Sequence, residues 1–191
     1  MPGLNIEVFI QNEAGSNRKN YHDEKTLEYK FTKLVSRAYP YPYGFIIGTT
    51  NEDGGNVDCF VITDQPLKTG QKVACAPIAL MEQVEDGKSD HNVLAVLSDE
   101  ISTIGAEVHS NLVDFVSHVF DHMKGKQIIA GRFWDREEAE AYITTHLDRP
   151  YSSEVAEASG WSYRNCRLNS FRPSEVRGVY RVFWLSCEKA R

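Results

Sequence analysis

The chain has 191 residues, a hydrophobic content of 41% and a formal net charge of −6 at pH 7. This length and composition suffice for one sizeable core, with or without an appended segment. Surfaces that bind nucleic acid are usually basic, so the acidic balance argues against a nucleic-acid partner. No apolar run approaches the ~20 residues of a transmembrane helix, and the N-terminus has no signal-peptide pattern. We therefore expect a cytoplasmic protein that does not enter a membrane.

The first hundred residues carry short strand signals that are separated by turn residues. Residues 5–11 alternate between apolar and polar side chains, and β-rich apolar runs follow at 44–50, 58–63, 72–81 and 92–98. Short strands at this spacing favour a small, closed or nearly closed β-barrel over alternating βαβ units.

Two helices are predicted after the strands. Residues 110–126 place apolar side chains on one helical stripe, with Gly125 as a plausible C-cap. Residues 135–147 begin with Asp135 as a candidate N-cap and carry acidic residues in the first turn. These helices are expected to pack outside the barrel.

The character of the chain changes after Pro150. A polar stretch rich in small residues is followed by an alternating, strand-like run at 176–186. We predict a barrel domain over residues 1–149 and a C-terminal extension over 150–191. The extension is expected to pack on the barrel or at a subunit interface.

The four cysteines lie far apart and form no CxxC pair. Structural zinc needs clustered ligands, and disulfide frameworks belong to small secreted domains, so we expect neither. Cys59 and Cys75 lie in apolar, strand-like contexts and are predicted to be buried thiols.

Acidic residues gather in and beside the turns of the strand region. Asp53 and Asp58 flank one glycine-rich loop, and Glu85 and Asp90 flank another. Residues at strand ends can converge over a barrel mouth, where carboxylates repel one another unless a cation neutralises them. Mg²⁺ takes oxygen ligands of this kind. Asp, Asn and Gly are also ordinary turn residues, so the spacing alone leaves both a metal site and simple turns open.

Three segments, taken in order, resemble the soluble family I inorganic pyrophosphatases. They are "YPYPYGFIIGTTNEDGGNVDCFVIT", "PIALMEQVEDGKSDHNVLAV" and "HVFDHMKGK". The resemblance covers roughly residues 5–147 and leaves the C-terminal extension outside. It implies a five-stranded β-barrel of the OB type with flanking α-helices, in an α+β, mainly β fold. It also implies a hydrolase whose cofactor is Mg²⁺, or Mn²⁺, and whose metal ions polarise phosphoryl oxygens and activate a water.

The resemblance assigns roles to individual residues. It implies that Asp53, Asp58 and Asp90 share one metal ion, and that Glu85 and Glu7 are further ligands. It further implies phosphate contacts from three side chains, which are Lys19, Tyr43 and Lys124. The catalytic set implied in this way is Asp53, Asp58, Asp90 and Tyr43.

Several positions depart from the family pattern. Gly55 replaces the middle aspartate of the first acidic loop and offers no group that can bind a metal or accept the proton of the nucleophilic water. Asn92 replaces a lysine, Met123 replaces a tyrosine, and Phe31 falls near the family's site arginine. Lys30 and Lys33 are imperfect substitutes for that arginine. The glutamate of the family's second strand has no direct counterpart, although Glu24 is a candidate replacement.

These features predict a divergent, Mg²⁺-dependent pyrophosphatase-like hydrolase. Its substrate would be pyrophosphate or an organic phosphate or diphosphate, and its activity on pyrophosphate itself would be weak. Loss of a general base typically lowers a rate by ~10²–10⁴. One alternative is a non-catalytic binding or scaffold protein, and another is an enzyme repurposed for a non-phosphoryl reaction in the same pocket. The resemblance also implies a homo-oligomer.

Two histidines on the first predicted helix form a separate candidate. His118 and His122 lie four residues apart, a spacing that can chelate a metal ion. Histidines are also common on helix surfaces beside an apolar stripe, and we favour that interpretation.

Overall fold

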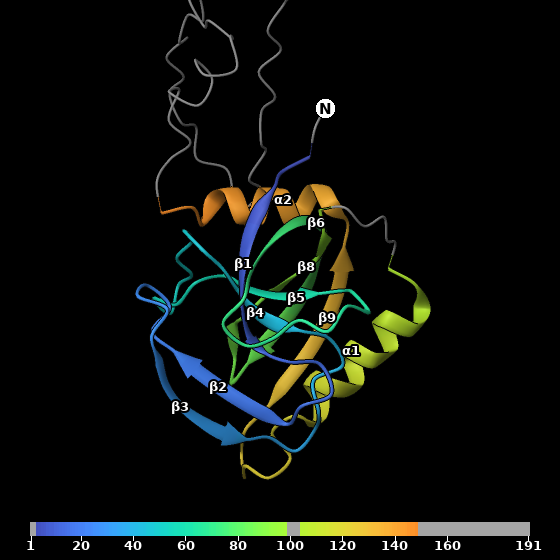
Figure 1. Ribbon diagram of the computed structural model, residues 1–191. Coiled ribbons are helices and arrows are strands. Elements are labelled where there is room, and N and C mark those ends of the chain that lie inside the picture. Colours follow the sequence, from blue (N-terminus) through green and yellow to red (C-terminus); the bar gives the residue numbers. More distant parts are fainter. Residues whose placement is uncertain (1–2, 99–103, 149–191) are drawn as a thin grey trace, which may run out of the picture. The chain divides into compact units, whose positions relative to one another are not determined.

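The computed structural model describes residues 3–98 and 104–148 (Figure 1). The predicted C-terminal extension, with its expected strand at 176–186, lies outside the described residues. Its separation from the barrel at residue 150 therefore stays a prediction. No helix in the described ranges is long and apolar enough to cross a membrane.

Five strands close a barrel in the order β1, β4, β5, β8 and β6, and β6 pairs back onto β1. Their bounds are Ile6–Asn12 for β1, Tyr43–Ile46 for β4, Asp58–Val61 for β5, Lys72–Glu85 for β6 and Asn92–Leu97 for β8. The β5–β8 pair is parallel and the other pairs around the ring are antiparallel. The predicted five-stranded barrel of the OB type is confirmed.

Strand β6 is longer than the sequence predicts, and it holds two additional strands. Its first half pairs with β1, whereas its second half also pairs with β7 (Lys88–Ser89) and β9 (Ile128–Trp134). Strand β9 is not among the predicted strands, because Gly131 interrupts its apolar pattern. A Cβ atom at Gly131 would lie 2.8 Å from Glu82 Cβ, so the close approach of β6 explains the glycine.

A separate hairpin, β2 (Arg18–His22) with β3 (Tyr29–Leu34), lies beside the barrel (Figure 1). The sequence gives it a weak signal because most of its side chains are polar or exposed. His22, at the end of β2, is buried and contacts the ring of Phe9 at a centroid distance of 5.0 Å. This contact attaches the hairpin to β1.

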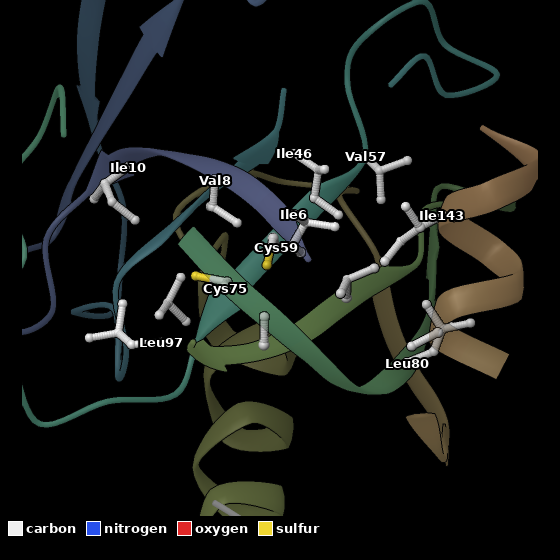
Figure 2. Packing of buried hydrophobic residues seen from close by; sticks show 14 of the residues in the cluster. Ile6, Val8, Ile10, Ile46, Val57, Cys59, Cys75, Leu80, Leu97 and Ile143 are labelled. Carbon is white, nitrogen blue, oxygen red and sulfur yellow. The ribbon is translucent and has the colours of Figure 1, made fainter. Parts of the chain in front are cut away.

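The core consists of two clusters of buried apolar residues. One fills the barrel with inward-facing residues of all five strands, and Ile143 of α2 (Arg136–Thr145) closes it (Figure 2). The other lies between the outer face of the barrel and α1 (Ala106–His118). Full burial of a Leu, Ile, Phe or Met side chain contributes about 1.5–3 kcal/mol. Cys59 and Cys75 are both buried, as predicted.

The two predicted helices exist, but the first one ends earlier than expected. Helix α1 ends at His118, and the chain continues through turns in which Gly125 has a positive φ of 81°. Met123, which lies within the predicted helix 110–126, is 45% exposed and does not extend the packed face. Helix α2 begins as predicted, because the Asp135 side chain accepts hydrogen bonds from the first backbone N–H groups.

Candidate functional site

Two neighbouring hollows lie where β5, β6, β8 and the β2–β3 hairpin meet. The first is a small cavity of about 50 Å³, and its polar lining consists of Lys19, Tyr39, Tyr43, Asp58, Gln83, Glu85, Asp90 and Asn92. The second is an open groove of about 720 Å³ between two loops, lined by Glu52, Asp53, Asp86, Gly87, Lys88 and Ser89 together with Glu85 and Asp90. Because Glu85 and Asp90 line both, four of the predicted ligands border one continuous region.

Asp58 is the most strongly perturbed of these carboxyl groups. Burial and, to a lesser degree, the charge of the nearby Asp90 raise its pKa to about 8, although the Tyr43 hydroxyl and the Lys19 ammonium act in the opposite direction. Burial and the charge of Glu85 also raise the pKa of Asp90, against a 2.8 Å hydrogen bond from Gln83 Nε2. Two adjacent carboxyl groups repel each other when both are ionised, and a bound cation would reduce this repulsion.

Asn92 adds a buried acceptor beside these carboxyl groups. Its Nδ2 donates to Gln83 Oε1 at 3.2 Å and to the Asp90 carbonyl at 3.3 Å. Its Oδ1 has no hydrogen-bond partner within residues 3–98 and 104–148, although Asn92 is 1% exposed. A buried acceptor without a partner costs about 1–3 kcal/mol, so this atom favours the entry of a donor or a cation.

Lys19 approaches the site from β2, and aromatic rings hold its side chain. Its ammonium lies 5.5 Å from the Tyr21 ring centroid and 5.0 Å from that of Phe120. Lys33 is the partner of Lys19 across the hairpin and lies 5.6 Å from the same Tyr21 ring. The residue opposite Lys19 is thus a cation, whereas Phe31 stacks on Tyr21 with a centroid distance of 4.5 Å.

The structure also brings in a lysine that sequence reasoning missed. Lys126 forms an ion pair with Glu85 and a second one with Asp86 at 3.1 Å. Lys124 lies in the exposed turns after α1 and lines neither hollow. The resemblance implies a phosphate contact for Lys124, whereas the lysine that contacts Glu85 in the structure is Lys126, two residues further on.

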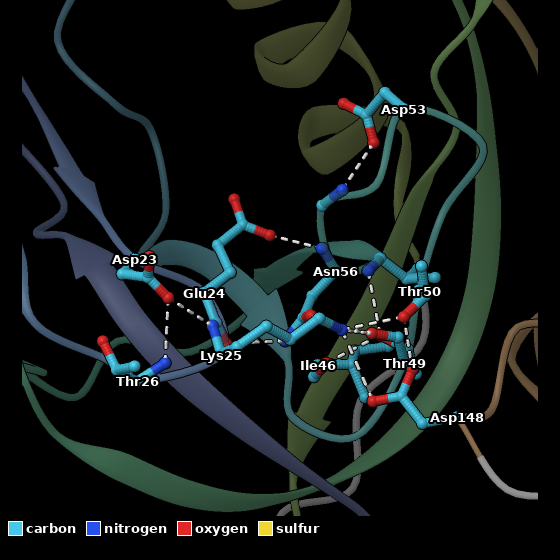
Figure 3. A network of polar contacts seen from close by, with 12 residues as sticks. Asp23, Glu24, Lys25, Thr26, Ile46, Thr49, Thr50, Asp53, Asn56 and Asp148 are labelled. Atoms are coloured by element: carbon cyan, nitrogen blue, oxygen red, sulfur yellow. Dashed lines mark hydrogen bonds and ion pairs between the residues drawn. The ribbon is translucent and has the colours of Figure 1, made fainter.

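Two other predicted ligands occupy different settings. Asp53 lines the groove, and its Oδ1 accepts a 2.9 Å hydrogen bond from the Gly55 N–H (Figure 3). Glu7 is exposed on β1 and lines neither hollow, while its carbonyl accepts a hydrogen bond from Ile47. The structure therefore brings Asp53 to the site together with Asp58, Asp90 and Glu85, and leaves Glu7 outside.

A model of the family described as inorganic pyrophosphatase matches residues 8–150. The chain belongs to the inorganic pyrophosphatase family. An inorganic pyrophosphatase of Nanoarchaeum equitans is 30% identical over 150 residues, which cover 73% of this chain and 94% of the relative. One from Corynebacterium efficiens is 28% identical over 76% of this chain and 98% of its own length. The solved inorganic pyrophosphatase of Neisseria gonorrhoeae superimposes with a TM-score of 0.71 at 27% identity, covering 78% of this chain and 93% of that one.

The oxygen atoms that line the candidate site of this chain fit a hard divalent cation. Carboxylates and the partnerless Asn92 oxygen surround the site, and oxygen is the ligand type that Mg²⁺ prefers. Across the described part of the chain, no three His, Cys, Asp or Glu side chains are grouped closely enough to hold an ion as they stand.

The two histidines of this chain that could chelate a metal ion, His118 and His122, do not form a common site. His118 Nδ1 lies 3.4 Å from Asp114 Oδ1, whereas His122 Nδ1 lies 2.8 Å from Ser36 Oγ. Each ring has its own local partner, in agreement with the surface interpretation.

Proposed function

We propose that this chain is a Mg²⁺-dependent hydrolase of the pyrophosphatase type that acts on pyrophosphate or on an organic phosphate or diphosphate. Its activity on pyrophosphate itself is proposed to be weak. The observation that carries this proposal is the meeting of Asp58 and Asp90 with Lys19 in one cavity. Such a cavity has room for a cation beside the carboxylates and for a phosphate oxygen beside the ammonium.

In the proposed site, Asp53, Asp58 and Asp90 hold the metal ion, Mg²⁺ or Mn²⁺, and Glu85 assists. Glu7 is left out of the proposal, because its side chain is exposed and lines neither hollow. When bound, the metal supplies positive charge that polarises phosphoryl oxygens and favours ionisation of a water. The raised pKa values of Asp58 and Asp90 support a role in which a cation restores their charge.

The cations of the chain bind the phosphate groups in this proposal. Lys19 neutralises the charge that develops on the leaving phosphate, and Lys33 lies across the hairpin as a second cation. The buried Tyr43 hydroxyl orients Asp58. Lys124 keeps its predicted phosphate contact only if the turns after α1 move, whereas Lys126 already contacts Glu85 at the site.

The experiment is phosphate release from pyrophosphate and from a nucleoside diphosphate, with Mg²⁺, by the wild type and by Asp58→Asn. Asp64→Asn is the matched control, because Asp64 is an exposed loop residue beyond the same strand. Activity that disappears in Asp58→Asn and persists in the control supports the proposal. Equal silence of all three proteins on both substrates would instead favour a binding or scaffold protein.

Family membership also supports two further proposals, one about the oligomeric state and one about the location in the cell. We expect a homo-oligomer and a cytoplasmic location. Sedimentation analysis of the full chain tests the first, and fractionation of cells that express it tests the second. A monomer at micromolar concentration would contradict the expected oligomer.

A further inference from the structure

The position of the missing loop carboxylate is not empty space. Gly55 lies outside the group of glycines with a positive φ, so its backbone conformation does not exclude a side chain. A Cβ atom at Gly55 would lie 3.0 Å from Glu24 Oε2 and 3.3 Å from Asp53 Oδ1. The carboxylate of Glu24 therefore occupies the space into which a side chain at position 55 would extend.

Glu24 reaches this place from a different part of the chain, and its neighbours fix it there. It lies in the β2–β3 turn, where Asp23 Oδ1 accepts hydrogen bonds from Lys25 N at 3.1 Å and from Thr26 N at 3.0 Å. Glu24 Oε2 accepts a hydrogen bond from the backbone N–H of Asn56 (Figure 3). The Lys25 ammonium binds three oxygens of the neighbouring loop, namely the Thr49 carbonyl at 2.7 Å, Thr50 Oγ1 at 2.7 Å and Asn56 Oδ1 at 2.8 Å.

The second carboxylate oxygen of Glu24 is available for another contact. Its Oε1 accepts no hydrogen bond from the residues that the structure describes, and in Figure 3 it points away from Asn56. Burial raises the pKa of Glu24, and the charge of Asp53 adds to this effect. Glu24 in turn contributes to the raised pKa of Asp58, so the three carboxyl groups form one electrostatic group.

We propose that Glu24 supplies the carboxylate that position 55 lacks. It holds the attacking water beside Asp53 and accepts its proton, and it adds negative charge that favours cation binding at the site. This inference rests on the proposed hydrolytic function. The water oxygen forms a bond to phosphorus, the bridging P–O bond breaks with its electron pair leaving on the bridging oxygen, and the proton of the water passes to Glu24. The products are two phosphates, or a phosphate and an organic phosphate.

If Glu24 had only a structural role, the hydrogen bond from Asn56 N would suffice, and a variant that keeps this bond would keep its activity. Glu24→Gln keeps the length of the side chain and an oxygen acceptor for that bond, but it cannot take the proton or carry charge. Glu28→Gln is the matched control, since Glu28 is an exposed glutamate in the same turn. Thermal melts of both variants check that the fold is preserved.

An exchange experiment adds a positive test. Gly55→Asp combined with Glu24→Gln returns a carboxylate to the loop while removing the one that crosses over from the hairpin. We expect Glu24→Gln to lower kcat by ~10²–10⁴, the usual loss for a general base, and the double variant to recover at least about tenfold of it. Glu28→Gln stays near the wild type. A value of kcat for Glu24→Gln within about twofold of the wild type, or a folded double variant without recovery, overturns the proposal.

A second readout separates this inference from the proposed function. Isothermal titration calorimetry with Mn²⁺ should show that Glu24→Gln binds the ion about tenfold more weakly than Glu28→Gln does. If the wild type releases no phosphate but the Mn²⁺ affinity changes in this way, the hydrolase proposal fails and the place of Glu24 at the cation site stands. If Glu24→Gln binds Mn²⁺ as tightly as the control, or if the wild type binds none, the Glu24 proposal fails.

Discussion

Lys126 forms an ion pair with Glu85, the residue that borders both the small cavity and the open groove. The Lys126 ammonium therefore neutralises part of the negative charge of Glu85, which a metal ion would otherwise use. The same lysine contacts Asp86 at 3.1 Å and lies 5.4 Å from the Phe120 ring centroid, so three neighbours hold it in place. In the proposed site, this lysine would compete with a metal ion from solution for the carboxylate of Glu85.

The first prediction follows from this competition. Lys126→Gln frees Glu85 and should strengthen Mn²⁺ binding by about two- to fivefold, the size expected for an ion pair near the surface. Isothermal calorimetry of the metal-free protein measures the change. Lys124→Gln provides the control, because Lys124 is exposed and lines neither hollow. Equal affinities in the two variants would contradict the competition.

The second prediction concerns the lysine pair on the hairpin. Lys19→Gln removes a charge-assisted phosphate contact worth about 1.5–3 kcal/mol and should lower kcat/KM by about 10- to 100-fold. Lys33→Gln should have a smaller effect in the same direction, because Lys33 is exposed and does not line the cavity. Steady-state kinetics with Lys72→Gln as an exposed control tests this order. A larger effect from Lys33 than from Lys19 would contradict it.

The third prediction is a dependence of stability on pH. The folded-state pKa of Asp58 is about 8, above the value of about 4 for an aspartate in an unfolded chain. The metal-free folded state therefore binds more protons between these values, and its free energy of unfolding decreases as the pH rises from about 4 to 8. Asp58→Asn removes this term, so it should raise the melting temperature at pH 8 by about 3 °C or more and leave it unchanged at pH 4.

Thermal melts in the presence of a metal chelator provide this measurement. Asp64→Asn controls for the general effect of removing one negative charge from the surface. Added Mg²⁺ should stabilise the wild type at pH 8 and have little effect on Asp58→Asn. The prediction is wrong if the wild type is as stable as Asp58→Asn at pH 8 without metal.

The fourth prediction tests the closure of the barrel by α2. Ile143 is completely buried between the helix and the strands, whereas Ile129 on β9 is 61% exposed. Ile143→Ala should lower the free energy of unfolding by about 2–5 kcal/mol through lost burial and a new cavity. Ile129→Ala removes the same atoms from an exposed position and should cost less than about 1 kcal/mol. Urea denaturation of both variants decides the matter.

The barrel was predictable because its strands carry a strong local signal. The runs that became β1, β4, β5 and β8 are short, apolar and bounded by turn residues, so local pattern and tertiary burial agree. The hairpin β2–β3 and the strand β9 lack this agreement. Most side chains of the hairpin are polar or exposed, and Gly131 interrupts the apolar pattern of β9 where β6 approaches closely.

The convergence of carboxylates in one cavity was predictable where they lie at strand ends, as for Asp58 and Asp90. It was not predictable where a residue arrives from a distant segment. Lys126 reaches Glu85 because α1 ends early, and Glu24 reaches Gly55 because the hairpin turn contacts the loop. Both contacts depend on how elements pack together, and no periodicity in the sequence encodes them.

The anchorage of Lys25 connects the hairpin turn to the last described residues of the chain. Lys25 Nζ lies 3.4 Å from Asp148 Oδ2, Thr50 hydrogen-bonds to Asp148, and Leu147 forms a β-bridge with Thr49. A chain shortened to Thr145 would lose all of these contacts while keeping every carboxylate of the site. Its loop 49–56 would have fewer attachments on both sides, so the geometry of the candidate site depends on residues that line neither of its two hollows.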